Sequence, residues 1–223
     1  QRLAFDELLA NQLALLLVRR RLKRLSGRPM QGDGRLRDQL EKLLPWPLTD
    51  AQRQANAEIA GDMGSNKRML RLLQGDVGSG KTMVALNAML LAVEAGAQAA
   101  LMAPTEILAR QHAETLMPYC RQLGVTLALL TGRDKGKARA ALLERLASGE
   151  IDILVGTHAL FQDDVVFHDL ALAVIDEQHR FGVGQRLSLA AKGQRDKGGV
   201  DVLVMTATPI PRTLSLTAYG DMD

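Results

Sequence analysis

Residues 70–95 read LRLLQGDVGSGKTMVALNAMLLAVEA, and this stretch decides the fold. The apolar run at 70–73 predicts a buried strand, and the apolar residues of 81–95 predict a helix. The turn between them, 75–82, matches the pattern G-x-x-x-x-G-K-[ST] at every fixed position. Its glycines let backbone N–H groups close around a phosphate, and the following helix points its positive end at the anion. The stretch therefore predicts a P-loop that binds a nucleotide.

The residues of this turn are candidate ligands of the nucleotide, namely Gly75, Asp76, Val77, Gly78, Ser79, Gly80, Lys81 and Thr82. In P-loop proteins the lysine reaches the β- and γ-phosphates, and the hydroxyl after it binds Mg²⁺. We therefore expect Lys81 to be catalytic and Thr82 to be a metal ligand. The cofactors this predicts are a nucleoside triphosphate and Mg²⁺.

The rest of the chain alternates between apolar strands and helices. Further strands are expected at 99–103, 126–130, 151–155, 172–175 and 200–205, and helices at 106–122, 137–148 and 184–192. Strands of continuous apolar character alternating with helices indicate an α/β domain with a doubly wound, mostly parallel sheet.

An N-terminal helical extension is expected before this domain. Helices at 1–25 and 36–44 are joined by a linker with glycine and proline at 26–35. Thr49 with Gln52 three residues later fits a capping box, which opens a helix that ends at about residue 62.

Two acids follow the strand at 172–175, in the order Asp176-Glu177-Gln178-His179. An acid at the carboxyl end of such a strand lies in the crevice where α/β sheets bind ligands. We expect Asp176 to hold Mg²⁺, directly or through water, and Glu177 to polarise the attacking water as the general base. Two acids at a strand end are by themselves more often a solvated strand end than a catalytic pair. The presence of a P-loop in the same chain favours the catalytic pair. The predicted reaction is Mg²⁺-dependent hydrolysis of a nucleoside triphosphate.

Five motifs in this order resemble those of superfamily 2 helicases and translocases: 75–82, 104–106, 156–158, 176–179 and 206–208. The residues within these motifs are similar to those of the RecG family of bacterial branch-migrating DNA helicases, and the resemblance covers about residues 48–223. Transcription-repair coupling factors are the alternative, with a similar motor that usually has a second acid in place of Gln178. A P-loop kinase or GTPase would need an acceptor-substrate site or an N-K-x-D motif, and neither is visible.

The resemblance implies an ATP-dependent DNA helicase that acts on replication forks and Holliday junctions. Gln52 would read the adenine edge and make ATP the preferred nucleotide, and His179 would join the cofactor-binding residues. A DNA-facing and coupling set would comprise Pro104, Thr105, Arg110, Gly156, Thr157, His158, Thr206, Ala207 and Thr208. Plainer roles stay open for some of these residues, because Gln52 also completes a capping box and a lone histidine such as His158 is usually structural.

The resemblance also implies parts outside these residues. Residues 48–223 would be the first RecA-like ATP-binding domain, and residues 1–47 a helical connector to a missing N-terminal wedge domain. A missing second RecA-like domain would supply arginine fingers, which are worth about 10³–10⁵ in rate. We therefore expect the chain to be a fragment that is nearly inactive alone.

Composition sets broader limits. The chain has 223 residues, a formal net charge of +3, 47% hydrophobic and 24% charged residues, which is typical of a globular protein. Its one cysteine, Cys120, cannot form an internal disulfide, and its longest apolar run near the start, 13–18, is too short to span a bilayer. We expect no membrane partner and a bacterial cytoplasmic location. The basic cluster at 19–24 either complements the dipole of the first helix or contacts a missing domain.

Overall fold

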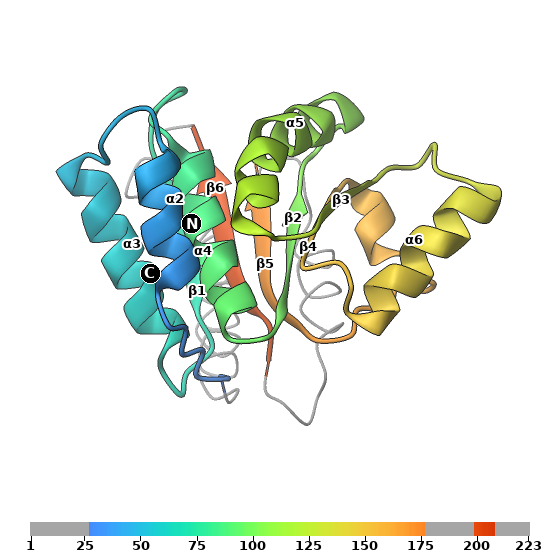
Figure 1. Ribbon diagram of the computed structural model, residues 1–223, viewed down its shortest axis with the longest axis horizontal. Coiled ribbons are helices and arrows are strands. Elements are labelled where there is room, and N and C mark those ends of the chain that lie inside the picture. The colour runs from blue at the N-terminus through green and yellow to red at the C-terminus, as the bar shows by residue number, and fades with distance from the viewer. Residues whose placement is uncertain (1–26, 177–198, 208–223) are drawn as a thin grey trace, which may run out of the picture.

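The structure is a computed structural model that describes residues 27–176 and 199–207 (Figure 1). The helices predicted at 1–25 and 184–192 lie outside these residues.

Within the described residues, six parallel strands form one sheet. They are β1 (Leu70–Gln74), β2 (Gln98–Met102), β3 (Leu127–Leu130), β4 (Ile153–Gly156), β5 (Leu170–Asp176) and β6 (Asp201–Thr206), in the order β1-β6-β5-β2-β4-β3. Every neighbouring pair is parallel, so all the strands end at the same edge of the sheet. The α/β prediction is confirmed, and the sheet of the described residues is wholly rather than mostly parallel.

Helices cover the sheet and flank its edges. They are α2 (Arg35–Leu43), α3 (Asp50–Met63), α4 (Lys81–Glu94), α5 (Glu106–Leu123) and α6 (Gly136–Ser148). Figure 1 shows α2, α3 and α4 gathered at the β1 end and α6 at the β3 end. A single turn of 3₁₀-helix, η1 (His158–Phe161), was not predicted, because four residues are too few to show a periodicity.

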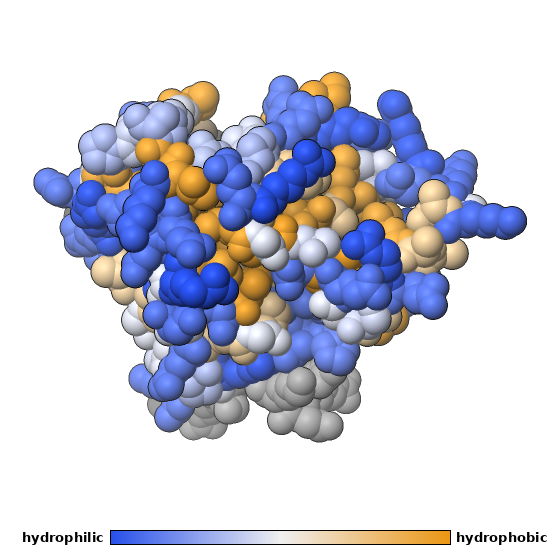
Figure 2. Space-filling model, viewed as in Figure 1, coloured by the Kyte–Doolittle hydropathy of each residue, from blue (hydrophilic) through white to orange (hydrophobic). Residues whose placement is uncertain are grey.

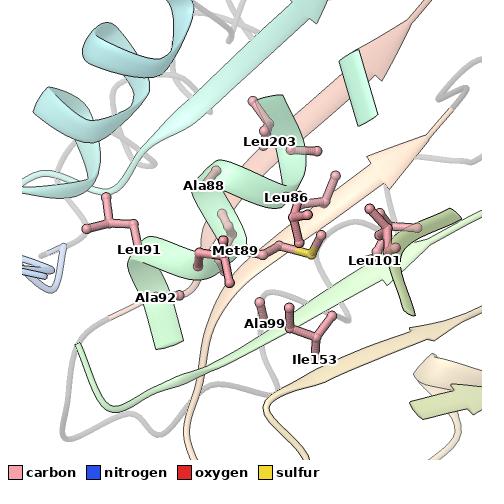
Figure 3. Packing of buried hydrophobic residues seen from close by; sticks show 14 of the residues in the cluster. Leu86, Ala88, Met89, Leu91, Ala92, Ala99, Leu101, Ile153 and Leu203 are labelled. Atoms are coloured by element: carbon pink, nitrogen blue, oxygen red, sulfur yellow. The ribbon is translucent and has the colours of Figure 1, made fainter. Parts of the chain in front are cut away.

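The two faces of the sheet pack into two hydrophobic clusters. Alternate residues of one strand go to opposite sides, as Ala99 and Leu101 do against Ala100 and Met102 of β2. Figure 3 shows Leu86 and Met89 of α4 packed over Leu101 of β2 and Ile153 of β4. Because both faces of the strands are covered, the strands carry continuous apolar runs. The packing of α4 on the sheet fixes where this helix begins, directly after the P-loop.

The surface reflects this packing. On the face drawn in Figure 2, hydrophilic residues cover the outer sides of α2, α3 and α6, and hydrophobic residues reach the surface between α2 and α6. Among the helices of the described residues, none has both the length and the apolar character to cross a membrane.

A buried carboxylate fastens helix α2 to the domain. The Glu94 side chain, 1% exposed at the end of α4, accepts N–H hydrogen bonds from Gly34, Leu36 and Arg37 at 2.8–3.1 Å. It also accepts from Nε of Arg37 at 3.0 Å. The N-cap residue of α2 is Gly34, which has no side chain to satisfy these donors. Glu94 therefore caps α2 from another helix, and Leu36 and Leu40 complete the attachment in the core.

Asp201, the first residue of β6, is buried with half of its carboxylate unpaired. The residue is 1% exposed, and Oδ1 accepts the N–H of Met69 at 2.7 Å. Oδ2 is buried and has no hydrogen-bond partner among the described residues. Burial raises the pKa of Asp201 from 3.8 to about 7, against the opposing effects of the Met69 N–H and the charge of Arg68.

We expect replacement of Asp201 by asparagine to stabilise the chain at pH 8 and to have a smaller benefit at pH 5. The folded-state pKa lies above the unfolded one, so the folded chain binds an additional proton between about pH 4 and 7. The stability this contributes is complete below about pH 4 and is lost as pH rises to about 7. The amide does not titrate, so the variant should gain on the order of a few kcal/mol relative to wild type across that range.

Urea unfolding at both pH values measures this difference. The unpaired amide has a fixed cost at every pH, so the pH dependence of the difference is the informative quantity. The matched control is Asp163→Asn, which removes an exposed carboxylate. If the free energy of unfolding changed with pH in the same way for Asp201→Asn and wild type, the raised pKa of Asp201 would be contradicted.

Candidate functional site

The carboxyl ends of the strands gather the predicted motifs at one edge of the sheet. The residues paired at these ends are Gln74 with Thr206, Asp176 with Met205, and Met102 with Ile175 and Gly156. The P-loop, Asp176 and the 206–208 motif therefore follow the neighbouring strands β1, β5 and β6. The 104–106 and 156–158 motifs follow β2 and β4. The same edge of the sheet thus has one half predicted to bind the nucleotide and, beside it, a half predicted to face DNA.

The P-loop takes a conformation that needs its glycines. Gly78 and Gly80 both have φ of 82°, in the left-handed region. Gly80 is the N-cap of α4, and its carbonyl accepts the N–H of Met83 at 2.9 Å. At the other end of the loop, the N–H of Gly75 donates to the carbonyl of Thr206 at 3.3 Å. The loop is therefore held by the P-loop helix at one end and by the end of β6 at the other.

Lys81 lies over the loop that it is predicted to serve. Its Nζ donates to the carbonyl oxygens of Gly75 at 2.6 Å and Asp76 at 2.8 Å. The ammonium group thus lies against the backbone of the loop that is predicted to bind the phosphates. Thr82 follows as the second residue of α4, at the positive end of that helix.

Gln52 joins the start of α3 to the P-loop. Its Oε1 accepts the N–H of Thr49 at 2.9 Å, and Thr49 Oγ1 accepts the N–H of Gln52 at 3.3 Å, which confirms the predicted capping box. Its Nε2 donates to the carbonyl of Ser79 at 2.8 Å. A Cβ at Gly80 would come within 2.4 Å of this Nε2, so the glycine leaves room for the amide. The Gln52 amide that completes the capping box therefore also lies against the P-loop, where it is predicted to contact the nucleotide.

Asp176 has a partner that the sequence did not reveal. His112 of α5 places Nε2 at 2.6 Å from Oδ2 of Asp176, and the two side chains are 13% and 12% exposed. His112 lies on the inward side of α5, one turn from the buried Ala109 and Leu116. A histidine on an apolar stripe is the signal that could have drawn attention to it, although the stripe does not reveal the partner.

The residues predicted to face DNA lie together but differ in exposure. The N–H of Ala103 donates to the carbonyl of Gly156 at 2.9 Å, which brings the two motifs side by side. Gly156 and Thr157 are buried, and a Cβ at Gly156 would lie 2.4 Å from the carbonyl oxygen of Leu130. These two residues therefore shape the backbone of this half.

The more accessible members of this set lie on α5 and η1. Thr105 is the N-cap of α5, and its Oγ1 accepts the N–H of Leu108 at 3.3 Å. Arg110 is exposed and donates to Glu106 at 2.9 Å, one turn before it. His158 is exposed at the start of η1, and Pro104 is half-buried. Arg110 and His158 are therefore the side chains of this set most open to a ligand.

Some of the remaining predicted residues lie within the described residues and some lie outside them. Thr206 is buried, 4% exposed, and Ala207 follows it half-buried. Glu177, His179 and Thr208 lie outside the described residues.

The oxygen donors present suit Mg²⁺ held jointly with a nucleotide. Residues 27–176 and 199–207 contain no group of three or more His, Cys, Asp or Glu side chains that could hold a metal ion unaided. Mg²⁺ in nucleotide sites is held by one or two protein oxygens together with phosphates and waters. The hydroxyl of Thr82 and the carboxylate of Asp176 are donors of this kind.

Comparisons with known proteins agree with this arrangement. The family model described as "DEAD/DEAH box helicase" matches residues 49–217. The "ATP-dependent DNA helicase RecG" of Escherichia coli O127:H6 is 51% identical over all 223 residues, which cover 32% of that protein. The protein of the same description from Bacillus subtilis is 60% identical over 182 residues, 82% of this chain and 26% of that protein.

A solved structure has the same fold as this chain. "Structure of RecG bound to three-way DNA junction" matches with a TM-score of 0.86 and 44% identity, covering 100% of this chain and 29% of that one. The chain therefore spans between about a quarter and a third of the length of these relatives.

Proposed function

The chain belongs to the DEAD/DEAH box helicase family, and from this we propose that it is the first motor domain of a RecG-type ATP-dependent DNA helicase that acts on branched DNA. The observation that carries the proposal is the common strand edge, where the P-loop and Asp176 lie beside the 104–106 and 156–158 motifs. The relatives named above are RecG helicases, and one of them is bound to a three-way DNA junction.

The nucleotide half would bind ATP with Mg²⁺. The loop at 75–80 would cradle the phosphates with backbone N–H groups, and Lys81 would pair with the terminal phosphates. Thr82 and Asp176 would hold Mg²⁺, which when bound neutralises charge on the phosphates. Glu177 would orient and deprotonate the attacking water, and Gln52 would read the adenine edge from its place against Ser79.

The DNA half would contact the sugar–phosphate backbone. Exposed Arg110 and His158 offer side-chain donors, and Thr105 offers a hydroxyl and the N-terminus of α5. Such contacts fix a strand without reading its sequence, as a translocating motor requires. Thr206, whose carbonyl already accepts the N–H of Gly75, would relay the state of the nucleotide to this half.

The site would be completed by other parts of a longer polypeptide. A second RecA-like domain would bring arginine fingers to the nucleotide, and a wedge domain would hold the branch point. Residues 1–47 would connect to that wedge domain, with α2 fixed to this domain through Glu94. We place the protein in the bacterial cytoplasm, where its DNA substrate and a reduced Cys120 would be found.

Measuring ATP hydrolysis by this chain and by the longer polypeptide tests the proposal. Each is assayed alone, with linear duplex DNA and with a forked DNA, and Glu177→Gln serves as the inactive control. We expect negligible turnover by this chain in all three assays and turnover by the longer polypeptide that the fork stimulates most. Brisk fork-stimulated turnover by this chain alone would contradict a half-site, and equal stimulation by linear duplex would contradict branched DNA as the substrate.

A further inference from the structure

Helix α5 contacts the predicted metal ligand directly. His112 lies 64 residues before Asp176 in the chain, and the 2.6 Å approach of its Nε2 to Oδ2 is a tertiary contact. The two side chains are 13% and 12% exposed, so water competes weakly for either group. A hydrogen bond to a charged carboxylate in such surroundings is among the stronger ones in proteins.

We propose that His112 is a positioning residue that fixes the Asp176 carboxylate for Mg²⁺, an inference that rests on the proposed function for the metal itself. Asp176 is the last residue of β5, at the strand edge that carries the P-loop. The imidazole engages Oδ2 and thereby sets the rotation of the carboxylate. The other oxygen, Oδ1, takes no part in this contact and is the one left for Mg²⁺ or its water.

His112 belongs to α5, so the contact links this helix to Asp176. Helix α5 begins at Thr105 and carries Arg110, so the same helix supplies residues predicted to face DNA. Its inward face is packed in the core through Ala109 and Leu116, which fixes the position of the helix against the sheet. The orientation of Asp176 therefore depends on where α5 lies.

Two variants separate positioning from simple support of the fold. His112→Ala removes the contact, and His112→Gln keeps a side-chain N–H donor that can reach the carboxylate. ATP binding to this chain is measured by calorimetry with Mg²⁺ and with EDTA, and the urea unfolding midpoint is measured for each variant. Partners of metal-ligating carboxylates typically contribute about 10–100-fold to metal affinity.

We expect His112→Ala to weaken ATP binding in Mg²⁺ by about 10–100-fold and to leave binding in EDTA unchanged. His112→Gln should recover most of the loss. In the Asp176→Asn background, His112→Ala should cause little further loss, because the group it positions is already changed. The Mg²⁺-dependent part of the affinity is the readout, since a merely structural role would lower binding equally in both conditions.

Three results would overturn the proposal. They are unchanged Mg²⁺-dependent affinity in His112→Ala, an equal loss with Mg²⁺ and with EDTA, and a full additional loss in the Asp176→Asn background. Binding that depends on Lys81 but not on His112 would sink this inference alone. Failure of the wild-type chain to bind ATP in either condition would sink it together with the nucleotide-binding part of the proposed function.

Discussion

Replacing Lys81 with alanine should weaken Mg·ATP binding by this chain about a hundredfold or more. Lys81 is the one P-loop side chain expected to bring a full positive charge to the terminal phosphates. Truncating one partner of a desolvated, hydrogen-bonded charge pair costs about 2–5 kcal/mol, and each 1.4 kcal/mol is about tenfold in affinity. Calorimetric titration of the wild-type chain and the variant with Mg·ATP measures the loss directly.

The same variant should fold almost normally. The present partners of Lys81 are the carbonyls of Gly75 and Asp76, in a loop whose tip at Val77 is 89% exposed. Water can replace the ammonium group at these carbonyls, so the free energy of unfolding should fall by less than about 1 kcal/mol. Lys137→Ala, which removes an exposed lysine of α6, is the matched control for charge. ATP affinity that is equal in Lys81→Ala, Lys137→Ala and wild type would contradict the P-loop assignment.

The sequence predicts the conformation of the P-loop and its flanking elements because they are local structure. Its lysine, its hydroxyl and its left-handed glycines all lie within residues 78–82, and the strand and helix beside it have clear apolar patterns. Asp176 could be placed on the same edge because parallel strands all end there. The capping box at Thr49 was likewise predictable, since both of its partners lie within four residues.

Contacts between distant segments could not be predicted in this way. Between α5, which carries His112, and β5, which ends at Asp176, lie β3, α6, β4 and η1. No periodicity shows which strand end a helix face will meet. The contact of Gln52 with Ser79 spans 27 residues, and only the folded chain shows that one amide serves both the capping box and the P-loop. Asp201 falls within the strand predicted at 200–205, and only the folded chain shows that its carboxylate is buried and accepts the N–H of Met69.

The attachment of α2 is a contact of the same kind, and it leads to the second large prediction. The family resemblance implies that residues 1–47 are a connector, and α2 in this range is amphipathic, with Leu36 and Leu40 buried. An amphipathic pattern predicts that a helix packs on something but not what it packs on. In the structure α2 packs on the last turn of α4, where the Glu94 carboxylate accepts hydrogen bonds from the first N–H groups of α2.

Glu94→Ala should lower the free energy of unfolding by about 3–5 kcal/mol, the usual cost of removing one partner from a buried charge pair. The variant leaves the N–H groups of Gly34, Leu36 and Arg37 without their acceptor, and the Arg37 guanidinium without its counter-charge. Glu94→Gln keeps the shape and one acceptor oxygen, so its loss should be smaller, about 1–3 kcal/mol. Urea unfolding at pH 7 measures both variants.

Hydrogen exchange shows whether the loss begins at α2. Because the N–H groups of Leu36 and Arg37 donate to the Glu94 carboxylate, both amides should exchange faster in Glu94→Ala, while amides of β2 and β5 keep their order of protection. Glu144→Ala removes an exposed acid from α6 and should change neither quantity. If Glu94→Ala matched Glu144→Ala in both measurements, α2 would be held by its leucines alone. Helix α2 would then be joined to α4 by apolar packing, with no capping contribution from the carboxylate.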